Sequence, residues 1–235
     1  MSLKTVLFDL DGTLLPMDQS IFIYAYFGEL SKKLEPYGYK TSTLVNTILE
    51  GTSAMVENDG RQTNETVFWN FFTGIFGKDV AAHIPMFEAF YRDDFDKIST
   101  VCGFSPMARK VIDDLHARDI ATVLATNPVF PAIATQKRIQ WAGLSPSDFS
   151  LITTYENSCH CKPNPDYYRD ILHTLDLCAE ECLMVGNDVD EDMVAQTLGM
   201  NVFLLTDCLI NKHEKSLDDY PHGNFEDLLR FLDKI

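Results

Sequence analysis

The stretch TVLFDLDGT, residues 5–13, decides the fold of this chain. Its first four residues are apolar or β-branched and a glycine follows soon after, a pattern that predicts a buried strand. Side chains alternate between the two faces of a strand, so Asp9 and Asp11 leave it on the same side. Two carboxylates this close are costly without a cation or a shared proton. The stretch therefore predicts a metal site, a proton-transfer site, or both.

Composition restricts the class of protein and its partners. The 235 residues, 46% of them apolar, suffice for one large domain or two small ones. A net charge of −16 argues against nucleic acid and anionic membranes as partners, because both require a basic face. No apolar run approaches the roughly 18 residues of a membrane span, and the N-terminus does not resemble a signal peptide. We therefore expect a cytoplasmic protein. We expect its six cysteines to be reduced thiols, because the sequence indicates no secretion signal. Cys159-His160-Cys161 lacks the second ligand pair of a zinc site, so we do not expect zinc there.

Residues 16–99 differ in character from the rest of the chain. They are rich in aromatic residues whose spacing is closer to helical than to alternating. The segment predicts several packed helices, with turns near residues 36–38, 58–60 and 76–77. Four of its basic side chains are candidates for contact with a substrate, but we expect them to be solvated: Lys32, Lys33, Arg61 and Arg92.

From about residue 100 onward, helices and strands are expected to alternate. Strands are predicted at 120–125, 151–153, 182–185 and 201–205. Helices are predicted after Ser105-Pro106, at 133–141, after Asn164-Pro165, at 193–198 and at 225–232. Such alternation predicts an α/β fold with a parallel sheet and ligands beyond the carboxyl ends of its strands. Residues 1–15 and 100–235 are expected to form this core, and 16–99 a helical domain inserted into it.

Polar residues follow four of the predicted strands. Asp9 and Asp11 follow the first, Thr126-Asn127 the second, a loop ending in Lys162 the third, and Gly186-Asn187-Asp188 the fourth, with Asp192 four residues on. Because strand ends converge in a parallel sheet, we expect one shared crevice. Carboxylates, a hydroxyl and a lysine suit Mg²⁺ and phosphoryl transfer, in which the protein positions the substrate and neutralises its charge.

These residues resemble the four motifs of the haloacid dehalogenase superfamily in the correct order: DxDGT at 9–13, Thr126, Lys162, and GND followed by Asp192. The resemblance covers 1–15 and about 100–235. It implies a Rossmann-like three-layer α/β/α core and a helical cap domain at 16–99.

The resemblance also implies roles for the matching residues. Asp9 would be the nucleophile that forms an aspartyl-phosphate, and Asp11 the acid and base, with its side chain free for proton transfer. Mg²⁺ would be held by Asp9, the backbone carbonyl of Asp11, and Asp188. Thr126 would bind the phosphoryl group and Lys162 would neutralise its charge. The remaining residues would support the site: Asp192 by orienting Lys162, together with Thr13, Asn127 and Asn187.

Asp11 also indicates the class of reaction that the resemblance implies, because phosphatases and phosphomutases of this superfamily carry Asp at this position, whereas dehalogenases generally do not. The leading interpretation is a Mg²⁺-dependent phosphatase acting on a small phosphorylated metabolite. A phosphomutase resembling β-phosphoglucomutase and a non-catalytic binding protein on the same fold are the alternatives.

Overall fold

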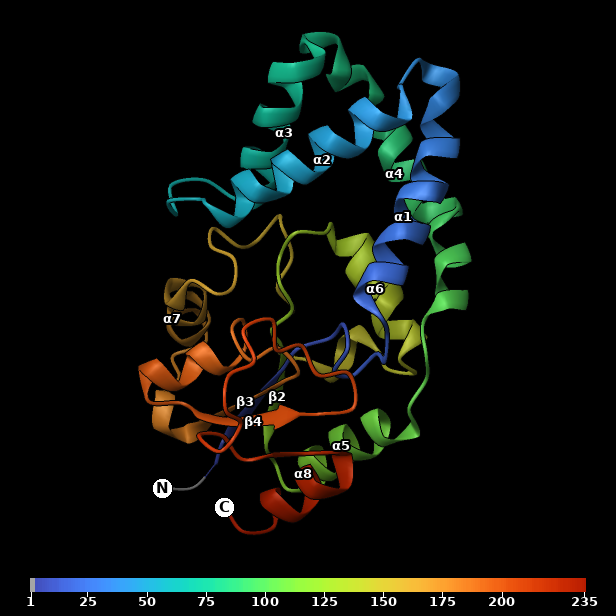
Figure 1. Ribbon diagram of the computed structural model, residues 1–235. Coiled ribbons are helices and arrows are strands. Elements are labelled where there is room, and N and C mark those ends of the chain that lie inside the picture. Colours follow the sequence, from blue (N-terminus) through green and yellow to red (C-terminus); the bar gives the residue numbers. More distant parts are fainter. Residues whose placement is uncertain (1–2) are drawn as a thin grey trace.

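The structure, a computed structural model, describes residues 3–235. Its centre is a five-stranded parallel sheet in the order β2-β1-β3-β4-β5 (Figure 1). Thr5 of β1 lies opposite Ala121 of β2 and Cys182 of β3, so β1 is an inner strand. The strands are β1 (Thr5–Phe8), β2 (Ala121–Leu124), β3 (Cys182–Gly186), β4 (Asn201–Leu205) and β5 (His222–Gly223).

Helices cover both faces of this sheet, as the alternating pattern predicts. Val6 and Phe8 of β1 pack in one buried apolar cluster, while Leu7 packs in the cluster on the opposite face. The first cluster contains residues of α5 (Pro106–Ala117) and α8 (Phe225–Leu232), and the second contains residues of α7 (Pro165–Thr174). The alternation of strand side chains thus produces the three-layer α/β/α core.

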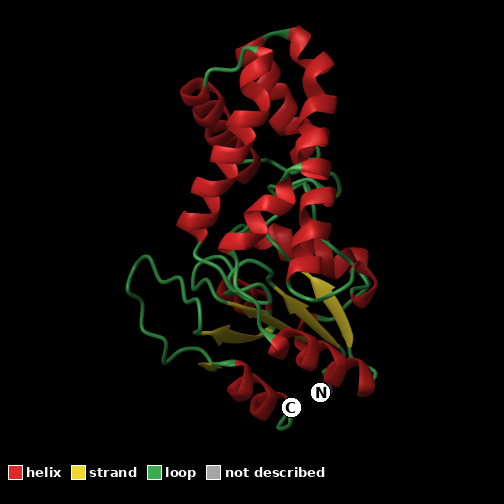
Figure 2. Ribbon diagram, turned by 90° about the vertical axis from the view of Figure 1, so that its right-hand side faces the viewer, coloured by secondary structure: helices red, strands yellow, loops and turns green. Residues whose placement is uncertain are grey.

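The predicted helical segment, residues 16–99, lies on the side of the sheet where the chain leaves β1 (Figures 1 and 2). Aromatic side chains are buried between its helices, including Phe22, Tyr26, Phe72, Phe87 and Phe90. The helices are α1 (Gln19–Leu34), α2 (Thr41–Val56), α3 (Asn64–Phe76) and α4 (Ile84–Asp93), with 3₁₀ turns at Glu35–Tyr37, Lys78–His83 and Phe95–Val101.

The two stretches of chain that connect this segment to the core lie side by side. Met17 forms an antiparallel bridge with Cys102, and the Gly103 amide donates to the Pro16 carbonyl at 2.7 Å. The chain therefore enters and leaves the helical segment through two connections that are hydrogen-bonded to each other. The division into separate domains at these positions stays a prediction.

Most predicted core elements form, and two differ. Ser105 and Asn164 cap α5 and α7 as expected, and α6 spans Ala132–Trp141. The predicted strand at 151–153 is reduced to one bridge, Leu124–Ile152, at the outer edge of β2. The predicted helix at 193–198 is a 3₁₀ helix. Asp192 precedes it but does not cap it, because its carboxylate bonds to Lys162 and to the Asp188 amide.

The outer surface contains no membrane-crossing element among the described residues. None of the helices is long and apolar enough to cross a membrane.

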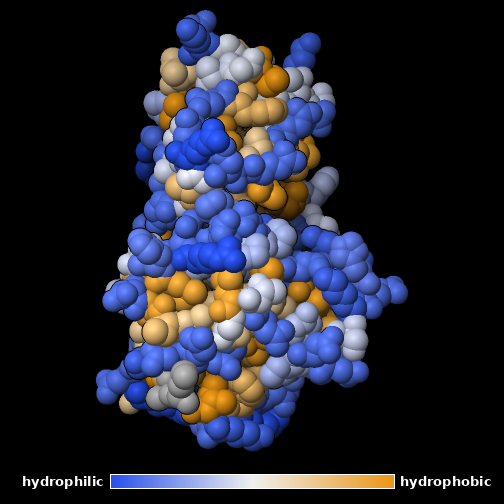
Figure 3. Space-filling model, turned by 90° about the vertical axis from the view of Figure 1, so that its left-hand side faces the viewer, coloured by the Kyte–Doolittle hydropathy of each residue, from blue (hydrophilic) through white to orange (hydrophobic). Residues whose placement is uncertain are grey.

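Figure 3 shows one face of the molecule, where hydrophilic residues predominate and hydrophobic patches are interspersed. The six cysteines are free thiols, and His160 of the Cys159-His160-Cys161 tract bonds to Asp170 at 2.7 Å.

Candidate active site

A small cavity at the carboxyl ends of β1, β2 and β3 brings the predicted residues together. Because β1 lies between its two neighbours, Asp9 is central, with Thr126 following β2 on one side and Asp188 following β3 on the other. The cavity has a volume of about 40 Å³ and is lined by Asp9, Asp11, Gln19, Thr126, Asn127, Asn187, Asp188, Glu191 and Asp192.

A buried lysine connects two of these carboxylates. The Lys162 ammonium donates to Asp9 Oδ1 at 2.9 Å and to Asp192 Oδ1 at 2.6 Å. Its side chain is 1% exposed. Burial alone would lower the pKa of Lys162, but Asp192 and Asp9 outweigh burial and raise that pKa. Lys162 is therefore a fixed cation beside the Asp9 carboxylate.

The turn after Asp9 is shaped by contacts with the loop after β3. Gly12 has a φ of +89°, and a Cβ there would lie 2.4 Å from Asn187 Nδ2, so only glycine fits without strain. The Thr13 hydroxyl donates to Asn187 Oδ1 at 2.9 Å, and Asn187 Nδ2 donates to the Cys208 carbonyl at 2.7 Å. Asn187, in the loop after β3, thus contacts the turn after Asp9 with one end of its side chain and the loop after β4 with the other.

The loop after β3 positions Asp188. Asp188 Oδ1 accepts hydrogen bonds from the amides of Asp190 and Glu191 at 2.8 and 3.0 Å. The Asp188 amide donates to Asp192 Oδ2 at 2.9 Å. A Cβ on Gly186 would lie 2.1 Å from the same Asp192 oxygen, so the close approach requires glycine. Asp192 therefore holds both Lys162 and the Asp188 loop.

Thr126 and Asn127 complete the opposite wall of the cavity. The Thr126 carbonyl accepts hydrogen bonds from Thr153 Oγ1 at 2.7 Å and from the Tyr167 hydroxyl at 2.9 Å, which fixes its backbone. Asn127 Nδ2 donates to Glu191 Oε2 at 3.0 Å, while Asn127 Oδ1 is buried without a hydrogen-bond partner.

The environment of Asp11 differs from the sequence expectation. Its side chain is not free: Asp11 Oδ2 accepts a hydrogen bond from Arg138, whose side chain is 1% exposed. The guanidinium also donates to Thr135 Oγ1 at 3.2 Å and lies 4.6 Å from the centroid of the Phe130 ring. Asp11 Oδ1 is buried without a partner. Burial raises the pKa of Asp11, and Arg138 and Lys162 oppose that rise.

This geometry accompanies a match to a known family over most of the chain. Residues 3–195 match the model of the haloacid dehalogenase-like hydrolases. The chain belongs to this family.

Individual relatives of this haloacid dehalogenase-like hydrolase are distant in sequence. It is 24% identical over 188 residues to the pyrophosphatase PpaX of Oceanobacillus iheyensis, covering 80% of this chain and 76% of that protein. A predicted phosphoglycolate phosphatase from Haemophilus somnus superposes with a TM-score of 0.61 at 16% identity, covering 98% of each chain. YfnB from Bacillus subtilis, a hydrolase described as bound to magnesium, gives a TM-score of 0.59 at 19% identity, covering 99% of this chain and 100% of YfnB. At these identities, the solved structures show the fold alone.

The side chains around the cavity suit a divalent cation. Within the described residues, five carboxylates line it, and two buried cations, Lys162 and Arg138, contact them. The imbalance leaves negative charge that a hard cation with oxygen ligands would neutralise. Among residues 3–235, no three His, Cys, Asp or Glu side chains form a ready-made metal cluster. The predicted ligand set differs from such a cluster, because only Asp9 and Asp188 contribute side chains and Asp11 contributes a carbonyl.

Two charged residues of this hydrolase site were not predicted from the sequence, Arg138 and Glu191. Arg138 lies on the buried face of α6 together with Ala134, Thr135 and Ile139. This helical spacing is the signal that could have identified Arg138 as a buried cation. Glu191 lies beside the cavity, and burial raises its pKa to about 7. It has no comparable sequence signal, because it stands in an acidic run.

Proposed function

We propose that the chain is a Mg²⁺-dependent phosphatase that hydrolyses a small phosphorylated compound through an aspartyl-phosphate on Asp9. The observation that carries the proposal is the carboxylate of Asp9, whose side chain is 11% exposed, at the end of an inner strand and 2.9 Å from the Lys162 ammonium. A buried carboxylate with a fixed cation on one oxygen keeps its second oxygen for attack.

In the first step, the second carboxylate oxygen of Asp9 attacks phosphorus and the bond to the leaving oxygen breaks. The leaving oxygen takes a proton, which we assign to Asp11. Lys162 lies against Asp9 and Asp192, so its charge is in place before the phosphoryl group arrives. Thr126, on the facing wall, would bind a phosphoryl oxygen.

In the second step, water attacks phosphorus of the aspartyl-phosphate and the Asp9–phosphorus bond breaks. Asp11 takes the proton from that water, and free phosphate and the Asp9 carboxylate are released. Asp11 must leave its contact with Arg138, or share its carboxylate between Arg138 and the reacting oxygen, in both steps. The turn of Gly12 and Thr13 carries that side chain and is anchored on Asn187.

Mg²⁺, when bound, would supply positive charge to the phosphoryl oxygens. Asp9 and Asp188 would hold it through their side chains, and Asp11 through its backbone carbonyl. The remaining residues of the predicted set, Thr13, Asn127, Asn187 and Asp192, would act by holding these groups in place.

We assign the helical segment the role of a cap domain. A cavity of about 40 Å³ is comparable to the space of one or two water molecules, so it suits a phosphoryl group rather than a whole ester. The rest of the substrate would lie toward the helices, which would select it and exclude water.

Phosphate release from a panel of phosphate esters and pyrophosphate, with Mg²⁺ and with EDTA, tests the proposal. We expect Mg²⁺-dependent release that D9N abolishes. The matched control is D119N, which changes an exposed aspartate near the opposite end of β2, where the left-handed backbone tolerates asparagine. Full activity of D9N would refute the mechanism. An isomerised sugar phosphate in place of free phosphate would indicate the phosphomutase instead.

A further inference from the structure

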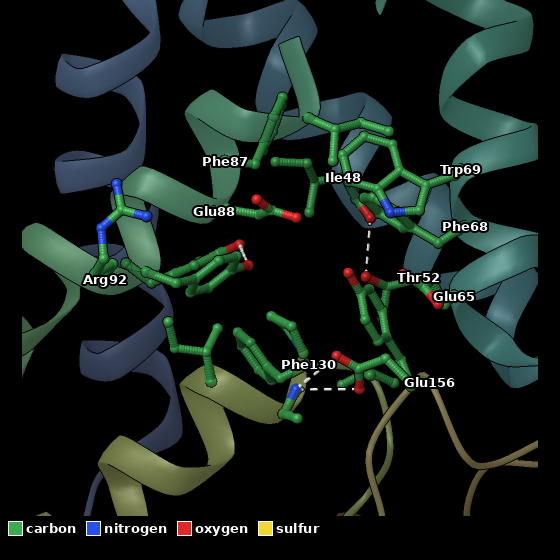
Figure 4. Close-up of a pocket in the computed structure, with 18 of the residues that line it drawn as sticks. Ile48, Thr52, Glu65, Phe68, Trp69, Phe87, Glu88, Arg92, Phe130 and Glu156 are labelled. Carbon is green, nitrogen blue, oxygen red and sulfur yellow. Dashed lines mark hydrogen bonds between the residues drawn. The ribbon is translucent and has the colours of Figure 1, made fainter. Parts of the chain in front are cut away.

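A second, much larger cavity lies within the helical segment and above α6. Its volume is about 580 Å³, within the range of small-molecule sites. Helices α1 to α4 form most of its wall, and the loop 129–131, the start of α6, Tyr155 and Glu156 form the rest (Figure 4). None of the residues that line it lines the cavity around Asp9. The two cavities are therefore distinct sites within residues 3–235.

Aromatic rings form much of the wall of this larger cavity. They include Phe68, Trp69, Phe87, Tyr91, Phe130 and Tyr155. Faces of aromatic rings attract cations because their π electrons are negative. The wall already holds one cation in this way, since the Arg138 guanidinium lies 4.6 Å from the centroid of Phe130.

The charged groups of the cavity are predominantly acidic. Among the described residues that line it, Glu65, Glu88 and Glu156 are anionic and Arg92 is the sole cation. Arg92 pairs with Asp93 at 3.0 Å, and its side chain is 62% exposed. Glu156 accepts hydrogen bonds from the Ala132 amide at 2.9 and 3.1 Å. The carboxylates of Glu65 and Glu88 thus add charge that Arg92 does not neutralise.

Two of the carboxylates lie close enough to act on the third, Glu65. The pKa of Glu65 is raised by burial and then by the charges of Glu156 and Glu88. Figure 4 shows Glu88 and Glu156 on opposite sides of the open centre, with Trp69 and Phe68 along a third side. An anionic occupant would be repelled here, whereas a positive charge would relieve the repulsion.

We propose that this cavity binds a small organic cation with an apolar body, such as an arylalkylammonium compound. The aromatic walls would bury the apolar body and the carboxylates would pair with the ammonium group. A bare metal ion would leave the aromatic surface unused, and a neutral apolar molecule would leave the carboxylates unpaired. The site goes beyond the proposed phosphatase activity, because binding needs neither Asp9 nor Mg²⁺.

Trp69 provides a direct reporter of binding. In a W141F background, Trp69 is the remaining tryptophan of the chain. We would titrate this protein with 2-phenylethylammonium chloride and follow tryptophan fluorescence, with 2-phenylethanol as the uncharged analogue of similar shape. We expect saturable binding that is about tenfold tighter for the cation than for the alcohol. Equal affinities, or no saturable change with either compound, would overturn the proposal.

Variants of the carboxylates test the role of charge. E88Q changes an exposed residue, and E65Q/E88Q removes two of the three charges; we expect the affinity for the cation to fall in both, and about tenfold in the double variant. The affinity for 2-phenylethanol should not change. E50Q is the matched control, because Glu50 is an exposed residue of α2 that does not line the cavity. Unchanged cation binding by folded E65Q/E88Q would refute the charge argument.

The cation could arrive as a free molecule or as part of a phosphate ester. Hydrolysis of 4-(2-aminoethyl)phenyl phosphate and of 4-ethylphenyl phosphate separates these sources. If the ammonium group belongs to the substrate, E65Q/E88Q should lower kcat/KM for the first ester alone. If E65Q/E88Q changes kcat/KM equally for the two esters, while the free cation still changes the fluorescence of Trp69, the cavity is a separate ligand site. Because fluorescence reports binding without catalysis, failure of the phosphatase proposal would leave this test intact.

Discussion

Replacement of Arg138 by methionine tests whether the site depends on the buried contact between Arg138 and Asp11. R138M removes the guanidinium but keeps a long apolar side chain on the buried face of α6. It removes the partner of Asp11 Oδ2, while Asp11 Oδ1, which is buried, already has none. The Thr135 hydroxyl loses the guanidinium donor at 3.2 Å, and Phe130 loses the cation on its ring.

The magnitude follows from burial. Arg138 is 1% exposed, and removing one partner of a buried ion pair typically costs about 3–5 kcal/mol, because the other charge is left uncompensated. We therefore expect R138M to lower the free energy of unfolding by about that amount. R118M is the control: Arg118 is 35% exposed and pairs with Asp114 and Asp233 at the surface. Its loss should cost about 0–1 kcal/mol.

A double-mutant cycle isolates the pair. Urea unfolding in EDTA, followed by circular dichroism, would be measured for wild type, R138M, D11N and R138M/D11N. Each single change leaves one buried charge alone, whereas the double change removes both, so we expect a coupling energy of roughly 1–3 kcal/mol. Additive effects of the two changes, or an R138M protein within about 1 kcal/mol of wild type, would refute the reasoning.

Three further perturbations probe the same site. K162M should abolish phosphate release and lower the free energy of unfolding by about 3–5 kcal/mol in urea titrations, because two buried carboxylates lose their cation. G12A should destabilise the protein by at least about 1–2 kcal/mol, because the φ of Gly12 is +89° and the new Cβ would contact Asn187. G28A is the control and should stabilise the protein by about 0.5–1 kcal/mol, because nothing lies near Gly28 in the middle of α1. Equal changes in the melting temperatures of the two variants would contradict this expectation. The pKa of Glu191, raised by burial to about 7, means that the folded state binds this proton more tightly than the unfolded chain, so stability should fall as pH rises from 4.5 to 7 in EDTA. Over this pH range, the free energy of unfolding of E191Q should decrease by roughly 3 kcal/mol less than that of the wild type. The same pH dependence of stability in E191Q and the wild type would refute the assignment.

Local chemistry made much of the core predictable. Apolar runs bounded by turn residues identified β1, β3 and β4, and the caps Ser105 and Asn164 are local side-chain bonds to the next turn. The motif residues follow those strands, so their convergence depends only on parallel pairing. Asp9, Thr126 and Asp188 line one cavity for this reason. Their catalytic roles stay predictions.

Contacts between distant residues were not predictable in the same way. Arg138 meets Asp11 across 127 positions, and Thr13 meets Asn187 across 174. Such pairs depend on how helices and loops pack, which neither periodicity nor turn chemistry specifies. The strand expected at 151–153 failed for a related reason, because it lies beside an edge strand and adds a single bridge there.

Helix α6 connects the two cavities through opposite parts of its surface. Ala132, Ile133 and Gln136 line the large aromatic cavity, while Arg138 reaches Asp11. Phe130 lines the same cavity, and the Arg138 guanidinium lies over its ring. The Phe130 side chain therefore lies between the cavity and the cation that pairs with Asp11. Glu156 lines the cavity and also caps α6 at Ala132. Packing through Phe130 and Arg138 thus connects the large cavity to the proposed acid–base group, even though the two cavities share no lining residue.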